Sequence, residues 1–246
     1  MITSQVVCNG ASTTAVAFGG TGTSYTWVND TPSIGLLASG SGNIGSFTAT
    51  NATSSPVVAT IIVTPVFTGT VVCNGPTKSF TITVNPTPTV SDPANQVVCN
   101  GANTTAINFS GTGTSYDWVN DTPSIGLLAS GTGNIAAFAA TNATASPVTA
   151  TIVVTPKYTF GSVTCNGPTQ SFTITVQPTP VVNAITNQVL CNGANTIAVN
   201  FGGTATAFNW TNNNTSIGLA GSGTGNIGSF VATNTGSVHT VATITV

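Results

Sequence analysis

Five cysteines are the residues of this sequence best suited to covalent chemistry. The first two are 65 residues apart and the next two 66, so each complete repeat described below contains two. No Cys-x-x-Cys pair or Cys/His cluster occurs, so no metal site is expected. We therefore expect disulfide bonds formed in an oxidising compartment. The five residues are Cys8, Cys73, Cys99, Cys165 and Cys191, of which Cys191 has no partner in its own repeat.

Two pairings of these cysteines are open on the sequence. Two per repeat is the simplest self-contained arrangement, so we expect Cys8–Cys73 and Cys99–Cys165. A loop of that length contributes about 4 kcal/mol in the chain-entropy model. The alternative comes from sandwich geometry, since a first and a last turn lie at opposite ends of seven strands. The bond would then join neighbouring repeats, with Cys8–Cys165 as the natural pair.

The inventory of titratable side chains argues against catalysis. His239 is the single histidine and lies far from any acid in the sequence. General acid–base and nucleophilic chemistry need paired titratable groups, so we expect no catalytic residue, no cofactor and no enzyme activity. Glycine runs such as Gly40–Ile44 lack the lysine and the following helix of a phosphate loop, and they are interpreted as turns.

One acidic motif is a candidate for a cation site. Asn29-Asp30-Thr31-Pro32 recurs at residues 120–123, but the third copy, at residues 212–214, has no acid. A single carboxylate beside hydroxyls is a weak calcium site. We interpret the motif as a strand-to-turn cap in which Asn and Asp bond their own backbone.

Charged residues are almost absent. They make up 2% of the chain, against about 25% in ordinary soluble proteins. Lys78 and Lys157 are the only cations, which excludes the basic surface of a nucleic-acid-binding protein. No apolar run approaches the roughly 20 residues of a spanning helix, so no membrane insertion is expected. Residues 1–7 do not form a signal peptide, so an export signal is expected outside this sequence.

A long motif that recurs three times sets the domain organisation. Its tryptophans, Trp27, Trp118 and Trp210, are 91 and 92 residues apart. A period this long indicates tandem domains with separate cores. We assign repeats to residues 1–87, 88–179 and 180–246, the last one incomplete.

Within each repeat, apolar residues alternate with small polar ones, as in half-buried strands. Gly- and Asn-rich turns separate these runs, as in an antiparallel sandwich. The predicted fold is therefore all-β, a series of tandem antiparallel β-sandwiches. The three tryptophans are expected in the cores rather than as sugar-stacking platforms. In the first repeat the clearest runs are Val16/Phe18, Tyr25/Trp27, Phe47/Ala49 and Phe80/Ile82.

Proline-rich segments mark both boundaries. Residues 85–88 read Asn-Pro-Thr-Pro and residues 177–180 read Gln-Pro-Thr-Pro. Such segments are semi-rigid spacers, so we expect the sandwiches to be arranged as beads on a rod.

The third repeat stops at Val246, the counterpart of Val154. It therefore lacks the last strand and the second cysteine. We expect Phe201 and Ile244 to lie along an open sheet edge, and a longer chain to supply the missing strand.

Several motifs together carry a resemblance to a known family. They are Cys99-Asn100-Gly101, Tyr116-Asp117-Trp118, the stretch from Ile125 to Ile135, residues 150–156, and Cys165-Asn166-Gly167-Pro168 leading into residues 171–178. This pattern resembles the PKD-like, immunoglobulin-like tandem repeats of large secreted surface adhesins in Bacteroidetes-type bacteria. The resemblance implies export, an extracellular or cell-surface location, and display in long repeat arrays.

Two functions follow. The first is a structural segment of an adhesin or filament, whose partners are other copies of itself and flanking repeats. The charge-poor surface lacks the like-charge repulsion that keeps proteins apart. The second is a glycan- or surface-binding module acting through loops that contain Asn29 and Asn120. A weaker third is ice or mineral binding, for which only Thr81/Thr83 and Thr173/Thr175 form clear ranks.

Overall fold

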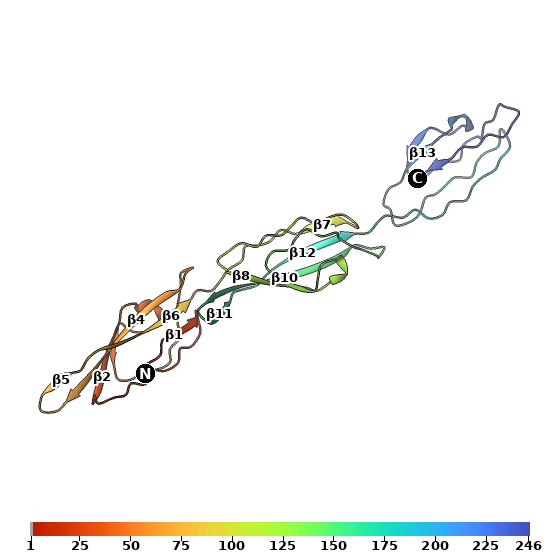
Figure 1. The fold of residues 1–246 in the computed structure, drawn as a ribbon. Coiled ribbons are helices and arrows are strands. Elements are labelled where there is room, and N and C mark those ends of the chain that lie inside the picture. The colour runs from red at the N-terminus through yellow and green to blue at the C-terminus, as the bar shows by residue number, and fades with distance from the viewer. Residues whose placement is uncertain (1) are drawn as a thin grey trace. The chain divides into compact units, whose positions relative to one another are not determined.

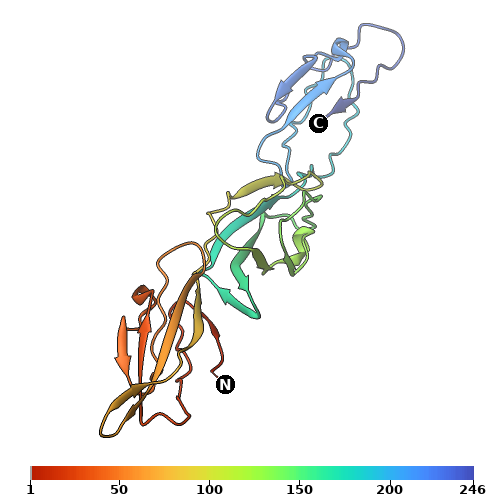
Figure 2. The ribbon, with the colours of Figure 1, turned by 60° about the vertical axis from the view of Figure 1, so that its left-hand side comes forward.

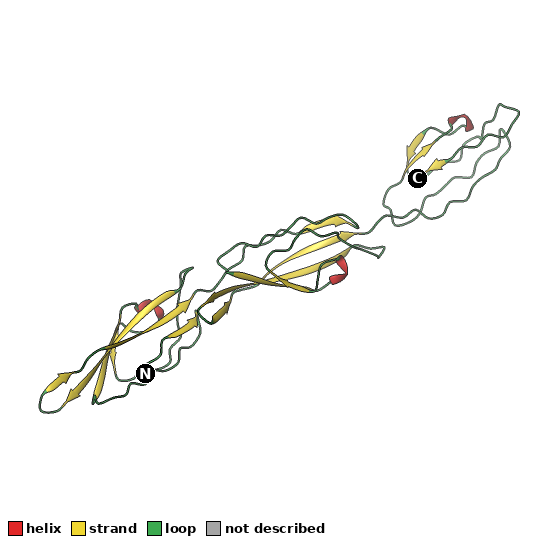
Figure 3. Cartoon of the chain, in the orientation of Figure 1, coloured by secondary structure: helices red, strands yellow, loops and turns green. Residues whose placement is uncertain are grey.

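A computed structural model describes residues 2–246 (Figure 1). The chain divides into two compact units. The first contains Met1–Thr141 and Val148–Val176, and the second contains Asn142–Pro147 and Gln177–Val246. The first unit holds most of the first two repeats, and the second unit holds the third. Strands make up most of the regular secondary structure, they are short in the third repeat, and the helical parts are single 3-10 turns (Figure 3).

A six-stranded sheet forms one layer of the first repeat, and its strands lie side by side in Figures 1 and 2. Most neighbours are antiparallel, but β1 pairs with β6 in parallel, which places Cys8 opposite Asn85. The order is β1 (Gln5–Cys8), β6 (Lys78–Asn85), β4 (Val57–Thr68), β2 (Ser24–Asn29) and β3 (Ser39–Ser41), with β5 (Val72–Asn74) paired to β4.

The second repeat has the same topology, and the third has three strands within the described residues. The second sheet runs β7 (Gln96–Cys99), β12 (Gln170–Gln177), β10 (Val148–Phe160), β8 (Ser115–Asn120) and β9 (Ser130–Thr132), with β11 (Val163–Asn166) paired to β10. The third runs β14 (Ser222–Thr224), β13 (Asn209–Asn212) and β15 (Ile244–Thr245). The 3-10 turns are η1 (Pro32–Ile34), η2 (Pro123–Ile125) and η3 (Thr215–Ile217).

The opposite layer of the sandwich consists of extended segments rather than regular strands. In the first repeat they meet through single bridges, Ser12 with Thr48 and Val16 with Ile44. Side chains accept hydrogen bonds from backbone amides that a ladder would otherwise use. Thr13 Oγ1 accepts from the Phe47 amide at 3.1 Å. The strands predicted through Val16/Phe18 and Phe47/Ala49 are therefore extended but not laddered.

Each repeat has its own hydrophobic core, containing its tryptophan. The all-β sandwich predicted from the alternation is confirmed, as is the immunoglobulin-like fold that the resemblance implied. Cores of the first two repeats are built from the inward faces of both layers, with Ile61 and Ile152 completely buried. In the third repeat the counterpart Ile244 is only half-buried, as is Phe201. Fewer strands cover this core within residues 2–246.

One predicted turn is instead a strand. The Ser-Gly-Ser segment at residues 39–41 forms β3, with Gly40 opposite Trp27. The same pairing joins Gly131 to Trp118 and Gly223 to Trp210. The glycine was expected only to allow a turn, but it also lies opposite the tryptophan in the neighbouring strand.

Candidate functional site

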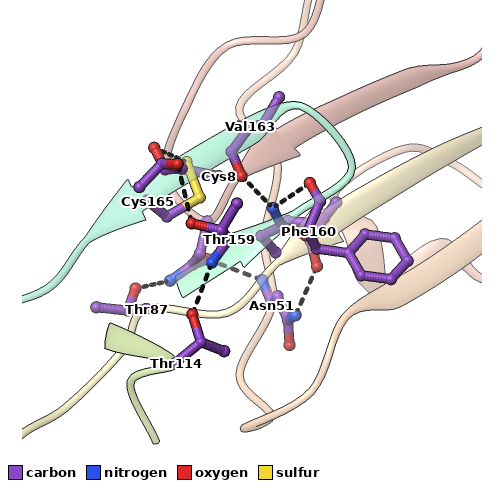
Figure 4. The surroundings of a disulfide bond; sticks show 12 residues. Cys8, Asn51, Thr87, Thr114, Thr159, Phe160, Val163 and Cys165 are labelled. Atoms are coloured by element: carbon purple, nitrogen blue, oxygen red, sulfur yellow. Dashed lines mark hydrogen bonds between the residues drawn. A yellow bond between two sulfur atoms is a disulfide. The ribbon is translucent and has the colours of Figure 1, made fainter. Parts of the chain in front are cut away.

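Cys8 and Cys165 form a disulfide bond between the first and second repeats (Figure 4). Their Cα atoms are 5.6 Å apart, and 157 positions separate them in the sequence. Cys73, Cys99 and Cys191 are free and exposed. The predicted pairs Cys8–Cys73 and Cys99–Cys165 are therefore wrong, and the alternative pairing between repeats is the observed one.

Sheet topology explains this outcome. Cys8 lies opposite Asn85, at the end of β6 that pairs with the start of β4 at Val57. Cys73 lies in β5, opposite Phe67 near the far end of β4. Ten residues of strand span about 33 Å, so the two sulfur atoms are far beyond bonding distance.

A β-hairpin of the second repeat reaches the first repeat beside this disulfide. Strands β10 and β11 form it, and β11 contacts β1. At its tip, the carbonyls of Phe160 and Val163 accept hydrogen bonds from Asn85 Nδ2, at 3.5 and 3.4 Å. Asn85 is completely buried there, and its Oδ1 has no hydrogen-bond partner among the described residues. The hairpin tip therefore excludes water from this amide group and bonds its nitrogen.

Asn9, in the Cys-Asn-Gly turn, holds the neighbouring backbone in place. Its amide donates to the Asn85 carbonyl at 2.9 Å. Its side-chain Nδ2 donates to Thr87 Oγ1 at 2.9 Å, and its Oδ1 accepts from the Asn51 amide at 2.8 Å. The sequence predicted a turn at this motif, but these contacts also connect the turn to the linker between the first and second repeats.

The first linker is packed rather than exposed. Pro86, Pro88 and Val90 are buried, whereas Thr87 and Thr89 between them are exposed. The linker thus alternates like a strand laid against the second repeat. The prediction of a semi-rigid spacer missed this packing.

Two glycines and a threonine of the second repeat form the groove for this linker. A Cβ on Gly167 would lie 1.8 Å from the Pro88 carbonyl oxygen, and one on Gly111 2.2 Å from that of Thr89. The Thr89 amide donates to Thr112 Oγ1 at 2.9 Å. Side chains at either glycine would therefore displace the linker.

The third repeat holds its own preceding segment in the same way. A Cβ on Gly203 would lie 1.9 Å from the Val181 carbonyl oxygen, and the Val181 amide donates to Thr204 Oγ1 at 2.9 Å. The Asn183 amide donates to the Gly202 carbonyl at 2.7 Å. A linker docked on a Gly-Thr pair is therefore a repeated feature of this chain.

The acidic motifs bond backbone groups. Asp30 Oδ1 accepts from the Thr60 amide at 2.8 Å and from the Thr31 hydroxyl at 2.9 Å. These bonds, the amide first, hold the pKa of Asp30 below its ordinary value. In the third repeat Asn213 accepts the same bond from the Thr243 amide at 2.8 Å. The position therefore works without a charge, as a structural cap requires.

Other candidate groups lie within the folded cores or turns. Trp27, Trp118 and Trp210 are buried. Asn29 and Asn120 are buried too, each donating to a backbone carbonyl of the following turn. Within residues 2–246, no group of three or more His, Cys, Asp or Glu side chains is placed to hold a metal ion. The same residues contain no helix long and apolar enough to span a membrane.

Comparisons with known proteins give similarity of fold class only. No protein-family model matches the chain, and no curated protein matches it. Among solved structures, the fibronectin(III)-like modules of Clostridium thermocellum CbhA are 12% identical, with a TM-score of 0.30, over 72% of this chain and 91% of theirs. The EC21-23 segment of human CDH23 is 12% identical, with a TM-score of 0.38, over 91% and 80%. Similarity this low does not indicate a shared function, and the fold assignment rests on the sheets described above.

Proposed function

We propose that this chain is a structural repeat segment of a large extracellular surface adhesin or filament, with no catalytic role. The observation that carries the proposal is the junction between the first two repeats. There a disulfide, a buried linker and a hairpin tip all connect the same two sandwiches. A disulfide and a packed linker between consecutive domains suit a protein that transmits tension along its chain.

The position of the disulfide in the chain supports a mechanical role. Residues 9–164 lie between Cys8 and Cys165. Tension applied to the two chain ends passes from Cys8 through the sulfur atoms to Cys165, so it bypasses those residues. Most of two sandwiches therefore stays folded or, if unfolded, cannot extend. Disulfides persist in oxidising surroundings, which supports the extracellular location.

Exposed apolar side chains recur from repeat to repeat and support association with other copies. Leu37 and its counterpart Leu128 are exposed, as are Val28 and Val119. Isolated exposed apolar residues are ordinary, but here they return with the period of the repeat on an almost uncharged surface. Copies of this chain and flanking repeats are accordingly the proposed partners.

The alternative of a glycan-binding module has less support. It relied on loop residues Asn29 and Asn120, and both side chains are buried and bonded to backbone. A glycan would have no access to them without unfolding of the turn.

Electron microscopy of the native material, with an antibody raised against this chain, tests the proposal. We expect the label on extracellular fibres or surface layers, and no binding of the chain on a glycan array. Label confined to the cell interior would contradict the structural role, and specific binding of the folded chain on the array would favour the glycan-binding alternative.

A further inference from the structure

The first repeat carries an open copy of the groove that holds the linker in the second repeat. A cavity of about 550 Å³ lies at the end of the sheet where β4 and β5 form a hairpin. Its lining includes Phe18, Gly20, Thr21, Tyr25, Cys73 and Gly75. No segment of residues 2–246 fills it as the first linker fills the groove of the second repeat.

Residue by residue, this lining matches the occupied grooves. Gly20 and Thr21 correspond to Gly111 and Thr112 of the second repeat, which contact Thr89. They also correspond to Gly203 and Thr204 of the third, which contact Val181. Gly75 corresponds to Gly167, whose missing side chain leaves room for the Pro88 carbonyl. The cavity therefore has the shape and the hydrogen-bond acceptor for an extended Pro-Thr-Pro-Thr-Val segment.

The hairpin beside the cavity supplies an independent observation. Phe67, Val71 and Val72 are 54%, 69% and 63% exposed. Val163, the counterpart of Val71 in the second repeat, is by contrast half-buried, because it meets the first repeat. Cys73 is exposed, whereas its counterpart Cys165 is 3% exposed and disulfide-bonded. The β4–β5 hairpin of the first repeat thus exposes the same surface that the β10–β11 hairpin of the second repeat buries at the junction between the two repeats.

We propose that this end of the first repeat binds the end of a preceding repeat of the same kind. The partner's Pro-Thr-Pro-Thr-Val segment lies in the cavity. The partner's first cysteine, the counterpart of Cys8, forms a disulfide with Cys73. This inference rests on the structural role proposed above, because that role makes a repeat of the same kind the expected partner. The new bond forms by exchange with a small disulfide such as oxidised glutathione. The two thiols lose two protons and two electrons to it, and two molecules of reduced glutathione leave.

The test adds a copy of residues 1–91 that carries Cys73→Ser ahead of the full chain, so that the lengthened protein contains one Cys73, that of the original first repeat. The added length preserves the 91-residue spacing between Cys8 and Cys99. The protein is refolded in a glutathione buffer, its free thiols are alkylated, and peptic peptides are mapped without reduction. We expect the first cysteine of the added repeat to be bonded to Cys73. The Cys8–Cys165 bond in the same sample shows that the original junction has folded. Alkylated Cys73 in molecules that contain Cys8–Cys165 would overturn the proposal.

A second measurement tests the groove without the disulfide. In the lengthened chain with Cys73→Ser, amide hydrogen exchange is followed at the threonine of the added linker that corresponds to Thr89. We expect exchange at least about tenfold slower than in an unfolded peptide. Exchange as fast as in the free peptide would contradict the docking.

Two variants make this readout specific. Gly75→Ala places a methyl group 3.0 Å from Pro65 Cγ in the open cavity, but its counterpart at Gly167 would overlap the linker carbonyl. Thr21→Val removes the hydroxyl acceptor. Each should abolish the protection, whereas Thr48→Val, an exposed position outside the cavity, should retain it. Failure here leaves the structural role intact, because microscopy tests that role separately.

Discussion

The indole ring of Trp27 packs directly on the backbone of Gly40 in the neighbouring strand. A Cβ on Gly40 would lie 2.2 Å from Cζ2 of the ring. The same relationship holds between Trp118 and Gly131, and the indole nitrogens of both rings are buried without a partner among the described residues. Each ring is therefore positioned by shape alone, and the glycine opposite it is part of the core.

A methyl group at this glycine should disrupt the core. We expect Gly40→Ala to lower the free energy of unfolding by about 1–3 kcal/mol, the usual cost of overpacking. Urea titration followed by tryptophan fluorescence measures it. Gly45→Ala is the matched control, because a Cβ there would have no atom within 4 Å. Equal stability of the two variants would show that the ring moves away without cost.

The disulfide between repeats should contribute to stability as well as to mechanics. We expect the double variant Cys8→Ser/Cys165→Ser to lose about 2–5 kcal/mol, because the closed loop is long. Urea titration of the full chain measures this loss. Cys99→Ser removes an exposed free thiol and should leave the transition unchanged. A transition equally sensitive to both changes would contradict the assigned pairing.

Asn85 should be the most sensitive polar position of the junction. Asn85→Ala removes both donors to the hairpin tip, and we expect a loss of about 1–3 kcal/mol. Hydrogen exchange at the tip residues 160–163 should become faster in this variant, while exchange in β8 stays unchanged. Faster exchange throughout the second repeat would instead indicate general unfolding.

The caps at Asp30 and Asp121 predict an acid-dependent loss of stability. Backbone amides, of Thr60 and Thr151 respectively, hold the pKa of each carboxyl below its ordinary value. Since the folded pKa is the lower one, the stabilisation is complete above the unfolded pKa and is lost as pH falls through the folded pKa.

Replacing both acids by asparagine should flatten this dependence. In Asp30→Asn/Asp121→Asn we expect a smaller loss of stability below about pH 4. Near neutral pH the variant should stay folded, since Asn213 makes the equivalent bond in the third repeat. Denaturant midpoints measured across the acidic range provide the comparison. An unchanged acid dependence would assign it to other groups.

The sequence predicted what depends on local pattern. Alternation and turn residues indicated the sandwich, and the period indicated separate cores. The β3 strand was missed because Ser-Gly-Ser has weak strand preference and becomes a strand only through pairing with Trp27. Similarly, Thr13 and Gln5 side chains took the place of ladder bonds in the opposite layer.

The junction depended on information that one sequence does not display. Cysteine spacing allowed both pairings, and the choice followed from β1 pairing with β6 while β5 lies at the other end of β4. The docking of Pro88 on Gly167 could not be predicted, because a glycine in a Cys-Asn-Gly-Pro turn is already explained by the turn. The repeat boundaries at residues 87 and 179 stay predictions.

Single-molecule stretching of the chain by its two ends tests the central claim, that tension passes from Cys8 to Cys165. In the oxidised chain we expect no extension from residues 9–164. After addition of a reductant, unfolding should release about 500 Å more, since the cysteines have a sequence separation of 157 and each residue step extends by about 3.4 Å. Release of that length without a reductant would contradict the account.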